Sequence, residues 1–134
     1  MSVTFNTVRL FLHIVAASIW VGGQLSLAEL LPVIRMFHPD GSSRVARQFA
    51  KLAWPAYALL ILTGIWNVIA MDPAKQSNGW HITLYFEIAM ALVSGLGALG
   101  HGAVKNKKAI GILGAVSALS ALAAMFLGVM LAGS

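Results

Sequence analysis

The sequence predicts an all-α integral membrane protein, an up-down bundle of four spanning helices. Of its 134 residues, 59% are hydrophobic and only 10% are charged, whereas soluble domains carry roughly 25% charged residues. The mean hydropathy of +0.84 indicates the same class. Four apolar segments each reach the length of about 20 residues that an α-helix needs to cross a bilayer.

The four predicted spans cover residues 8–31, 49–71, 80–100 and 109–132 and form a single domain. The links between the first three spans contain HPDGSSR and MDPAKQSNG, whose Pro, Gly, Asp, Asn and Ser residues are typical of turns. The third link, HGAVKNKK, is basic. Because short links place neighbouring helices side by side in opposite directions, an antiparallel bundle is expected.

The basic residues predict the orientation of these spans. Only Arg9 and Lys75 lie on the side of the termini and the second link. The other seven lie on or beside the first and third links: Arg35, Arg44, Arg47, Lys51, Lys105, Lys107 and Lys108. Positive residues concentrate on the cytoplasmic side of the plasma membrane, so both termini should lie outside. The net charge of +5 is therefore explained by orientation in a lipid membrane. It does not predict nucleic acid as a partner.

Polar residues inside the third predicted span form a stripe along one helical face. Its members follow one another at intervals of three or four residues: Thr83, Glu87, Met90, Ser94, Gly97 and His101. This spacing predicts a continuous face. A carboxyl group in hydrocarbon is costly, so the stripe should face the bundle interior or a partner.

A second group of polar residues shares a depth in the outer third of the predicted bundle. His13, Asn67, Glu87 and Met125 each lie several residues from the outer end of a different span. Imidazole, carboxylate and thioether groups are all credible copper ligands. His13, Glu87 and Met125 are therefore the predicted metal ligands, with pairing of His13 to Glu87, and Met125 as an apolar filler, as the plainer interpretation.

Trp20 lies seven residues after His13, which places both on one helical face. A tryptophan there would wall a flat cofactor or fill the core, so His13, Trp20 and Met125 are the predicted cofactor-binding residues.

The chain has no cysteine, which excludes disulfides and thiolate ligands. It also lacks a nucleophile elbow, a phosphate loop and a carboxylate pair, so no catalytic residue is predicted and enzymatic activity stays open.

The motifs LHIVAASIWVGG (residues 12–23) and LTGIWN (residues 62–67) resemble the copper resistance protein D family of bacterial membrane proteins. The resemblance covers the whole four-span unit, and its specific motifs lie in the first two spans. His13, Trp20 and Gly22 or Gly23 carry the histidine, tryptophan and glycine pattern. A weaker resemblance is to the membrane-type haem-binding protoporphyrinogen oxidases of bacteria. Both imply a protein of the bacterial inner membrane.

Three functions follow from these residues and resemblances. The first is copper handling, with the ion in the outer third of the bundle. The second is a b-type haem protein for electron transfer, with His13 as axial ligand and Met125 or another histidine opposite. The third is a structural subunit of a membrane complex. A homodimer or a larger assembly is compatible with each, because four short spans make a thin bundle.

Overall fold

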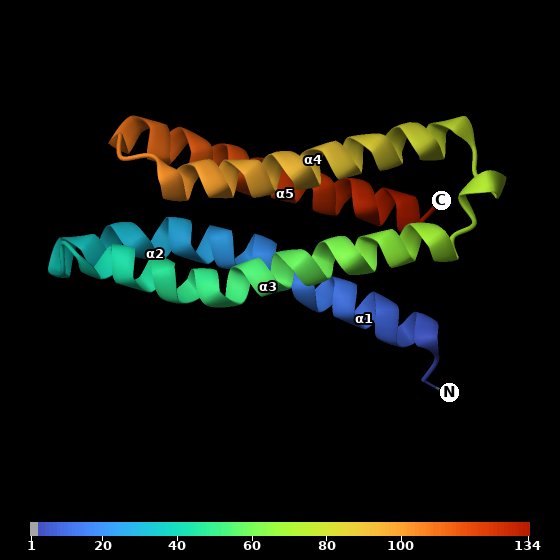
Figure 1. Ribbon diagram of the computed structural model, residues 1–134, viewed down its shortest axis with the longest axis horizontal. Helices are drawn as coiled ribbons and strands as arrows, with labels where there is room; N and C mark the ends of the chain where they lie inside the picture. The colour runs from blue at the N-terminus through green and yellow to red at the C-terminus, as the bar shows by residue number, and fades with distance from the viewer. Residues whose placement is uncertain (1–2) are drawn as a thin grey trace. The chain divides into compact units, whose positions relative to one another are not determined.

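The computed structural model describes residues 3–134, and these residues confirm the predicted all-α class. No strand occurs among them. The elements in chain order are α1 (Phe5–Ala17), the π-helical turn η1 (Ser18–Gly22), α2 (Gly23–Phe37), α3 (Gly41–Ala70), the short 3₁₀ helix η2 (Pro73–Lys75), α4 (Asn78–Ala103) and α5 (Lys107–Ala132) (Figure 1). Because α1, η1 and α2 run on without a break, they make one long helix.

The chain therefore has four helices that are long and apolar enough to cross a membrane. They have 33, 30, 26 and 26 residues, more than the predicted spans. At the starts of α4 and α5, polar caps lie just ahead of the apolar runs. Ser77 accepts a hydrogen bond from the Trp80 backbone N–H, and Asn106 accepts from those of Lys108 and Ala109. Such caps satisfy the free N–H groups of a first turn, so the helix begins before its hydrophobic stretch.

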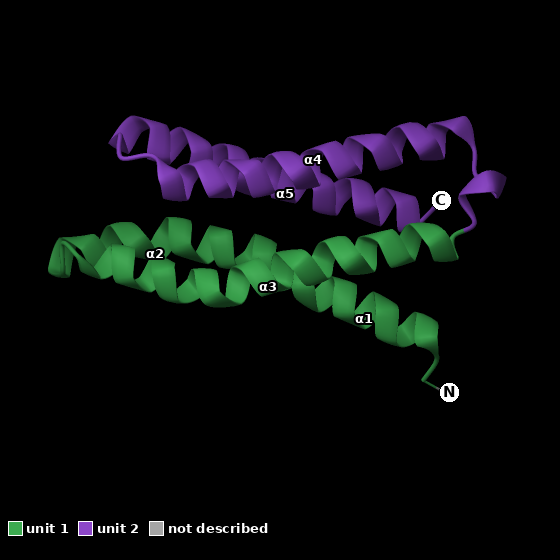
Figure 2. Cartoon of the chain, in the orientation of Figure 1, with its two compact units in different colours: residues 1–71 green, residues 72–134 purple. Residues whose placement is uncertain are grey.

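The helices group into two compact units, unit 1 (residues 1–71, described from residue 3) and unit 2 (residues 72–134) (Figure 2). Unit 1 pairs the long first helix with α3, and unit 2 pairs α4 with α5. Each unit is thus an antiparallel helical hairpin. A single domain of four spans would require these two units to pack together, so that expectation stays a prediction.

In unit 1, the first helix crosses α3, with α1 on one side of the crossing and α2 on the other (Figure 1). The π-helical turn between them carries Trp20, which is only 3% exposed. The Trp20 ring lies 5.4 Å from that of Trp54 and 4.4 Å from that of Tyr57, measured between centroids. Offset aromatic pairs at these distances add stability beyond the area that they bury. The crossing is therefore built around an aromatic cluster, Trp20, Trp54 and Tyr57.

In unit 2, the predicted polar stripe of α4 faces α5. The Ser117 hydroxyl donates a 2.8 Å hydrogen bond to the Ser94 carbonyl, and His101 Nδ1 lies 2.8 Å from the Ile110 carbonyl. A Cβ atom built on Gly97 would lie 3.1 Å from the Leu113 carbonyl oxygen and the Ser117 backbone nitrogen. The two backbones therefore approach closely there, as small residues allow in membrane helices. Ser94, Gly97 and His101 of the stripe therefore lie against α5, and the prediction that the whole stripe avoids lipid stays a prediction.

The close approach at Gly97 yields a stability prediction. Gly97→Val should lower the unfolding free energy by about 1–3 kcal/mol, because the added atoms meet the α5 backbone and overpack the hairpin. Gly111→Val is the matched control, since a Cβ atom on Gly111 has nothing within 4 Å. Titration of the reconstituted protein with sodium dodecyl sulfate, followed by circular dichroism, measures both. Equal midpoints for the two variants would contradict the close approach.

Candidate functional site

The histidine of the first helix, His13, is tied to α3 through one ring nitrogen. His13 Nδ1 lies 2.8 Å from the Thr63 hydroxyl oxygen. That hydroxyl has one proton, and it donates to the Leu59 carbonyl at 2.7 Å within α3. With that proton on the Leu59 carbonyl, the His13–Thr63 bond takes its proton from Nδ1. We therefore infer the tautomer with N–H at Nδ1 and a lone pair at Nε2.

Among residues 3–134, the remaining ring nitrogen, Nε2, has no side-chain hydrogen-bond partner, and the ring also lies close to the Leu60 backbone. The neighbouring ring carbon, Cε1, lies 3.6 Å from the position of a Cβ atom built on Gly64. A glycine at that point keeps side-chain bulk away from this edge of the ring. Metal-binding histidines characteristically fix one ring nitrogen in a hydrogen bond and present the other to the metal. The geometry of His13 has that form.

One turn before His13, the guanidinium of Arg9 is buried, with the residue only 7% exposed. Its Nε and Nη1 groups are fully enclosed and have no hydrogen-bond partner among residues 3–134. On α3, one turn after Thr63, the amide oxygen of Asn67 is likewise enclosed and unpaired. A buried charge without a partner costs several kcal/mol as an order of magnitude. The site therefore contains a cation whose counter-charge is supplied by nothing in its own helices.

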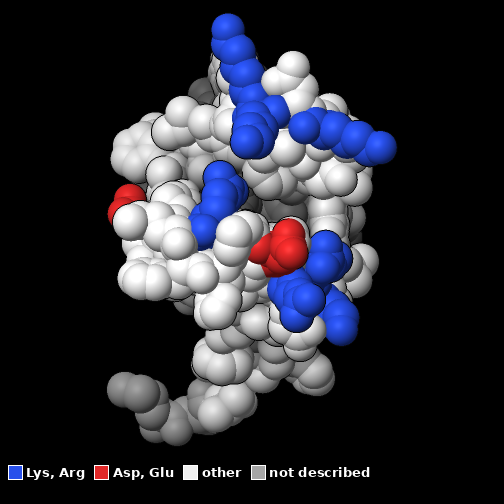
Figure 3. Space-filling model, turned by 90° about the vertical axis from the view of Figure 1, so that its left-hand side faces the viewer, with Lys and Arg blue, Asp and Glu red and all other residues white. Residues whose placement is uncertain are grey.

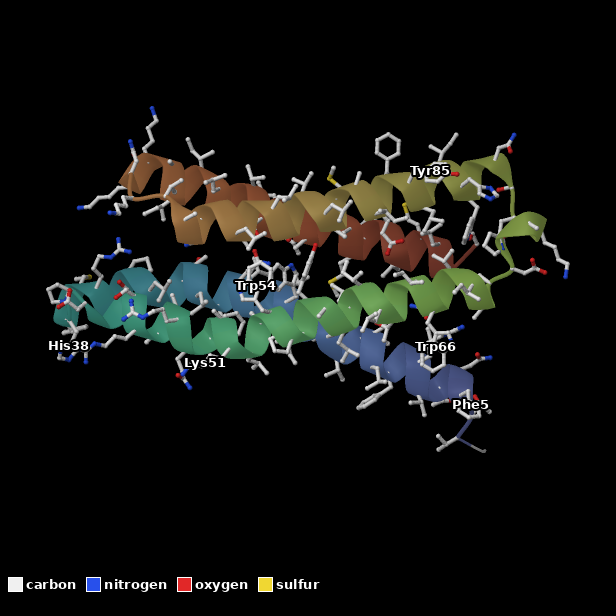
Figure 4. The ribbon with its side chains drawn as sticks, in the orientation of Figure 1. Phe5, His38, Lys51, Trp54, Trp66 and Tyr85 are labelled. Atoms are coloured by element: carbon white, nitrogen blue, oxygen red, sulfur yellow. The ribbon has the colours of Figure 1, made fainter. Side chains whose placement is uncertain are left out.

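The antiparallel pairing of α1 and α3 brings four polar residues to the same end of unit 1. His13 and Thr63 are in contact, so Arg9, one turn toward the start of α1, lies level with Asn67, one turn toward the end of α3. We call Arg9, His13, Thr63 and Asn67 the polar cluster of unit 1. Phe5 and Trp66 mark this end of α1 and α3 in Figure 4. The cluster occupies the end of unit 1 opposite the turn between α2 and α3.

The other predicted ligands, Glu87 and Met125, belong to unit 2, whereas His13 belongs to unit 1. The Glu87 carboxylate is half-buried and faces α5, because a Cβ atom on Gly128 would lie 2.8 Å from its Oε1 atom. Met125, one turn before Gly128, is 46% exposed. Among residues 3–134, no three or more His, Cys, Asp or Glu side chains form a group that could hold a metal ion. The set of His13, Glu87 and Met125 stays a prediction.

The three other histidines have positions at or near helix ends. His38 caps the end of α2 and is exposed. His81 Nδ1 lies 2.9 Å from the Ser77 carbonyl in the first turn of α4. His101 bonds to Ile110 across the turn between α4 and α5. Local backbone groups therefore account for the orientation of His81 and His101.

Comparison with known proteins adds no relative, since neither a protein-family model, nor a curated protein, nor a solved structure matches this chain.

Sequence reasoning identified His13 and noted the depth of Asn67, but it assigned Arg9 to topology and gave Thr63 no role. A signal for both was present in the spacing. Arg9 precedes His13 by four residues, and Asn67 follows Thr63 by four, so each pair lies on one helical face. Two such pairs on neighbouring antiparallel helices indicate a shared polar layer. The pairing register that joins them is visible only in the structure.

The tautomer of His13 gives a direct test of this geometry. In ¹⁵N-histidine-labelled protein, His13 should show a protonated Nδ1 and an unprotonated Nε2, assigned by the signals lost in His13→Gln. Thr63→Val should change the shift of Nδ1 and lower the unfolding free energy by about 1 kcal/mol, because Nδ1–H loses its acceptor. A proton on Nε2 in the unsubstituted protein would contradict the assignment.

Proposed function

We propose that this chain is a b-type haem-binding membrane protein that transfers electrons, with His13 as an axial ligand of the haem iron. The observation that carries the proposal is the imidazole hydrogen-bonded to Thr63 through Nδ1, with no side-chain partner at Nε2 among residues 3–134. Histidine is the usual axial ligand of haem iron, and helical bundles hold such cofactors between facing helices. A bound haem would supply one-electron redox chemistry, and the chain supplies position and charge.

The residues around His13 fit such a cofactor in two respects. Gly64 keeps bulk away from the ring edge next to Nε2. Trp20, Trp54 and Tyr57 form an apolar aromatic cluster further along the same two helices, toward which a flat macrocycle can lie.

The buried charge of Arg9 favours haem over a bare copper ion. A guanidinium one turn from the ligand repels a metal cation, and the repulsion is strong where little water screens it. The carboxylates of a haem would instead give Arg9 the hydrogen-bonded counter-charge that it lacks. Arginine is well suited to this pairing because its planar fork binds carboxylates with two bonds. Copper handling, which the copper resistance protein D resemblance implies, is the competing function and is separated by the experiment below.

Helix length and composition support a multi-pass membrane protein, and the proposal places it in the bacterial inner membrane with both termini outside. Four basic residues lie on or near the turn of unit 1, and Lys105, Lys107 and Lys108 lie at the turn of unit 2. Lys and Arg side chains are visible in the end-on view of Figure 3. The bias toward the turns supports their cytoplasmic location. The polar cluster would then lie near the outer surface.

The haem proposal predicts an absorption spectrum. Protein purified from membranes, or reconstituted with haem, should show a Soret band that His13→Ala abolishes. His38→Ala is the matched control and should leave the band unchanged, because this exposed histidine lies at the far end of the hairpin. Bound copper without a Soret band would overturn the haem assignment in favour of copper handling. Binding of neither would favour the structural subunit.

Arg9 provides a second, finer test. Arg9→Gln should weaken haem binding about tenfold or more, since one charge-assisted hydrogen bond contributes about 1.5–3 kcal/mol. The dimethyl ester of haem, which lacks free carboxylates, should bind the unsubstituted protein and Arg9→Gln equally. If Arg9→Gln weakens both forms alike, Arg9 acts on the structure and does not bind the carboxylates.

The orientation is tested by cysteine labelling in this cysteine-free chain. Ser43→Cys lies at the α2–α3 turn and Ser77→Cys at the start of α4, and both positions are exposed. In intact cells, an impermeant maleimide should label position 77 and leave position 43 unlabelled until the membrane is opened. Labelling of position 43 from outside would reverse the proposed topology.

A further inference from the structure

The first turns of α3 carry three basic residues on one face. Arg44, Arg47 and Lys51 follow one another at intervals of three and four residues, so they are neighbours on the helix surface. All three are exposed, and none forms an ion pair among residues 3–134. Asp40, one turn before Arg44, is the only acidic residue from position 38 to position 51. We call Arg44, Arg47 and Lys51 the basic face of α3, and its positive charge exceeds the single negative charge of Asp40.

Beside this face lies an open, largely apolar groove of about 460 Å³. Val45, Gln48, Phe49 and Leu52 line it from α3, and Leu27 lines it from α2. The groove therefore lies between two helices of unit 1, in the half of the hairpin next to the α2–α3 turn. Its volume falls within the range of about 300–1,000 Å³ that is typical of sites for small molecules. It is thus large enough to hold part of a lipid chain.

The groove has an inner wall and an outer edge. A Cβ atom built on Gly23 would overlap the Phe49 ring, so this ring lies directly against the α2 backbone, one turn before Leu27. Phe49 and Leu27 are partly buried, whereas Val45 and Leu52 are exposed. An occupant would therefore contact the Phe49 ring inside the groove and two aliphatic side chains at its edge.

Gln48 connects the groove to the basic face. It lines the groove, and it lies four residues after Arg44 and three before Lys51, so it neighbours both on the helix surface. The apolar stretch predicted for this helix begins at residue 49, which places Arg44 and Gln48 at the polar end of the groove and Leu52 at the apolar end. Positive charge and apolar surface therefore meet here, as phosphate and acyl chain do in a phospholipid.

We propose that this part of unit 1 binds an anionic phospholipid, with an acyl chain in the groove and the phosphate group against the basic face. Basic pockets between membrane helices bind lipid headgroups in this way. Long Lys and Arg side chains can keep their apolar stems along the helix and extend their charged ends to the membrane surface. The charge disfavours a second copy of the chain as occupant, because a symmetric partner would bring the same positive face. The site is separate from the polar cluster and does not rest on the proposed haem.

The test is native mass spectrometry of the full chain in detergent, titrated with dioleoyl phosphatidylglycerol. Dioleoyl phosphatidylcholine has the same acyl chains without the net charge, and it should bind about tenfold more weakly or less. The combined substitution Arg44→Gln, Arg47→Gln and Lys51→Gln should remove most of this difference, since each basic residue near an anionic lipid contributes about fivefold in affinity. Equal affinity of the unsubstituted protein for the two lipids would overturn the proposal.

The matched control removes three charges from the turn of unit 2. Lys105→Gln, Lys107→Gln and Lys108→Gln together change the net charge by the same amount, and all three positions are exposed, as are those of the basic face. This variant should keep the affinity of the unsubstituted protein for phosphatidylglycerol. An equal loss in the two triple variants would show attraction by net charge alone and overturn the site on α3.

The groove is tested with the basic face intact. Val45→Trp places an indole at its edge and should weaken phosphatidylglycerol binding about threefold or more, because the acyl chain loses contacts there. Leu62→Trp, at a position of α3 that is 65% exposed and outside the groove, is the control and should bind normally. Unchanged binding in Val45→Trp would overturn the groove as the acyl-chain site. The same spectra count chains, and a dimer that Val45→Trp dissociates would assign the groove to a second copy instead.

Discussion

A hydrocarbon environment offers no hydrogen bonds, so polar side chains on helices apolar enough to span a membrane are stabilised by bonding to one another or to backbone carbonyls. In unit 1, the Thr63 hydroxyl lies within hydrogen-bond distance of the Leu59 carbonyl of its own helix and of His13 Nδ1 on the first helix. In unit 2, Ser117 donates to the Ser94 carbonyl across the hairpin. Because each bond joins particular residues, it fixes which turn of one helix lies beside which turn of the other. The polar bonds thereby set the pairing register, which apolar packing in lipid specifies less strongly.

The two hairpins meet this constraint with different packing. Unit 2 brings its backbones together at Gly97, where a side chain would meet the α5 backbone. Unit 1 separates its helices with an aromatic cluster, and its first helix widens into a π-helical turn at Trp20. A π-helical turn is rare in an otherwise α-helical segment and often accompanies a functional site. In unit 1 it places a bulky indole against α3 within the segment that carries His13.

The sequence was sufficient to predict the helices and the faces that pack within unit 2. Four apolar stretches predict four helices, and the periodic stripe from Thr83 to His101 predicts the face that meets α5. These inferences rest on a helix acting alone, whose period and apolar length are written in the sequence. The helix ends were placed less well. Polar caps at Ser77 and Asn106 begin α4 and α5 ahead of their apolar runs, and α3 begins at Gly41, within the polar link, without a side-chain cap.

The candidate site depends on pairs of helices, and this is where sequence reasoning was incomplete. Counting charges along the sequence does not show whether Arg9 is exposed at the membrane surface or buried between helices. The count therefore treated it only as an indicator of topology. Thr63 is an ordinary residue of an apolar span until α1 is placed beside it. Of the predicted ligands, His13 lies in unit 1, whereas Glu87 and Met125 lie in unit 2. The packing within either hairpin therefore does not determine whether the three meet.

Under the proposed function, Arg9 would make the site a compromise between folding and binding. Without an anion, its enclosed N–H groups make the folded hairpin less stable than an apolar side chain of the same volume would, as replacements of buried ion pairs show in other proteins. With a carboxylate in place, the same groups gain charge-assisted hydrogen bonds in surroundings that screen them little. The residue therefore acts against stability in the empty hairpin and in favour of it in the occupied one. This opposition distinguishes a ligand-binding arginine from one that serves packing, because packing would favour the folded state in both.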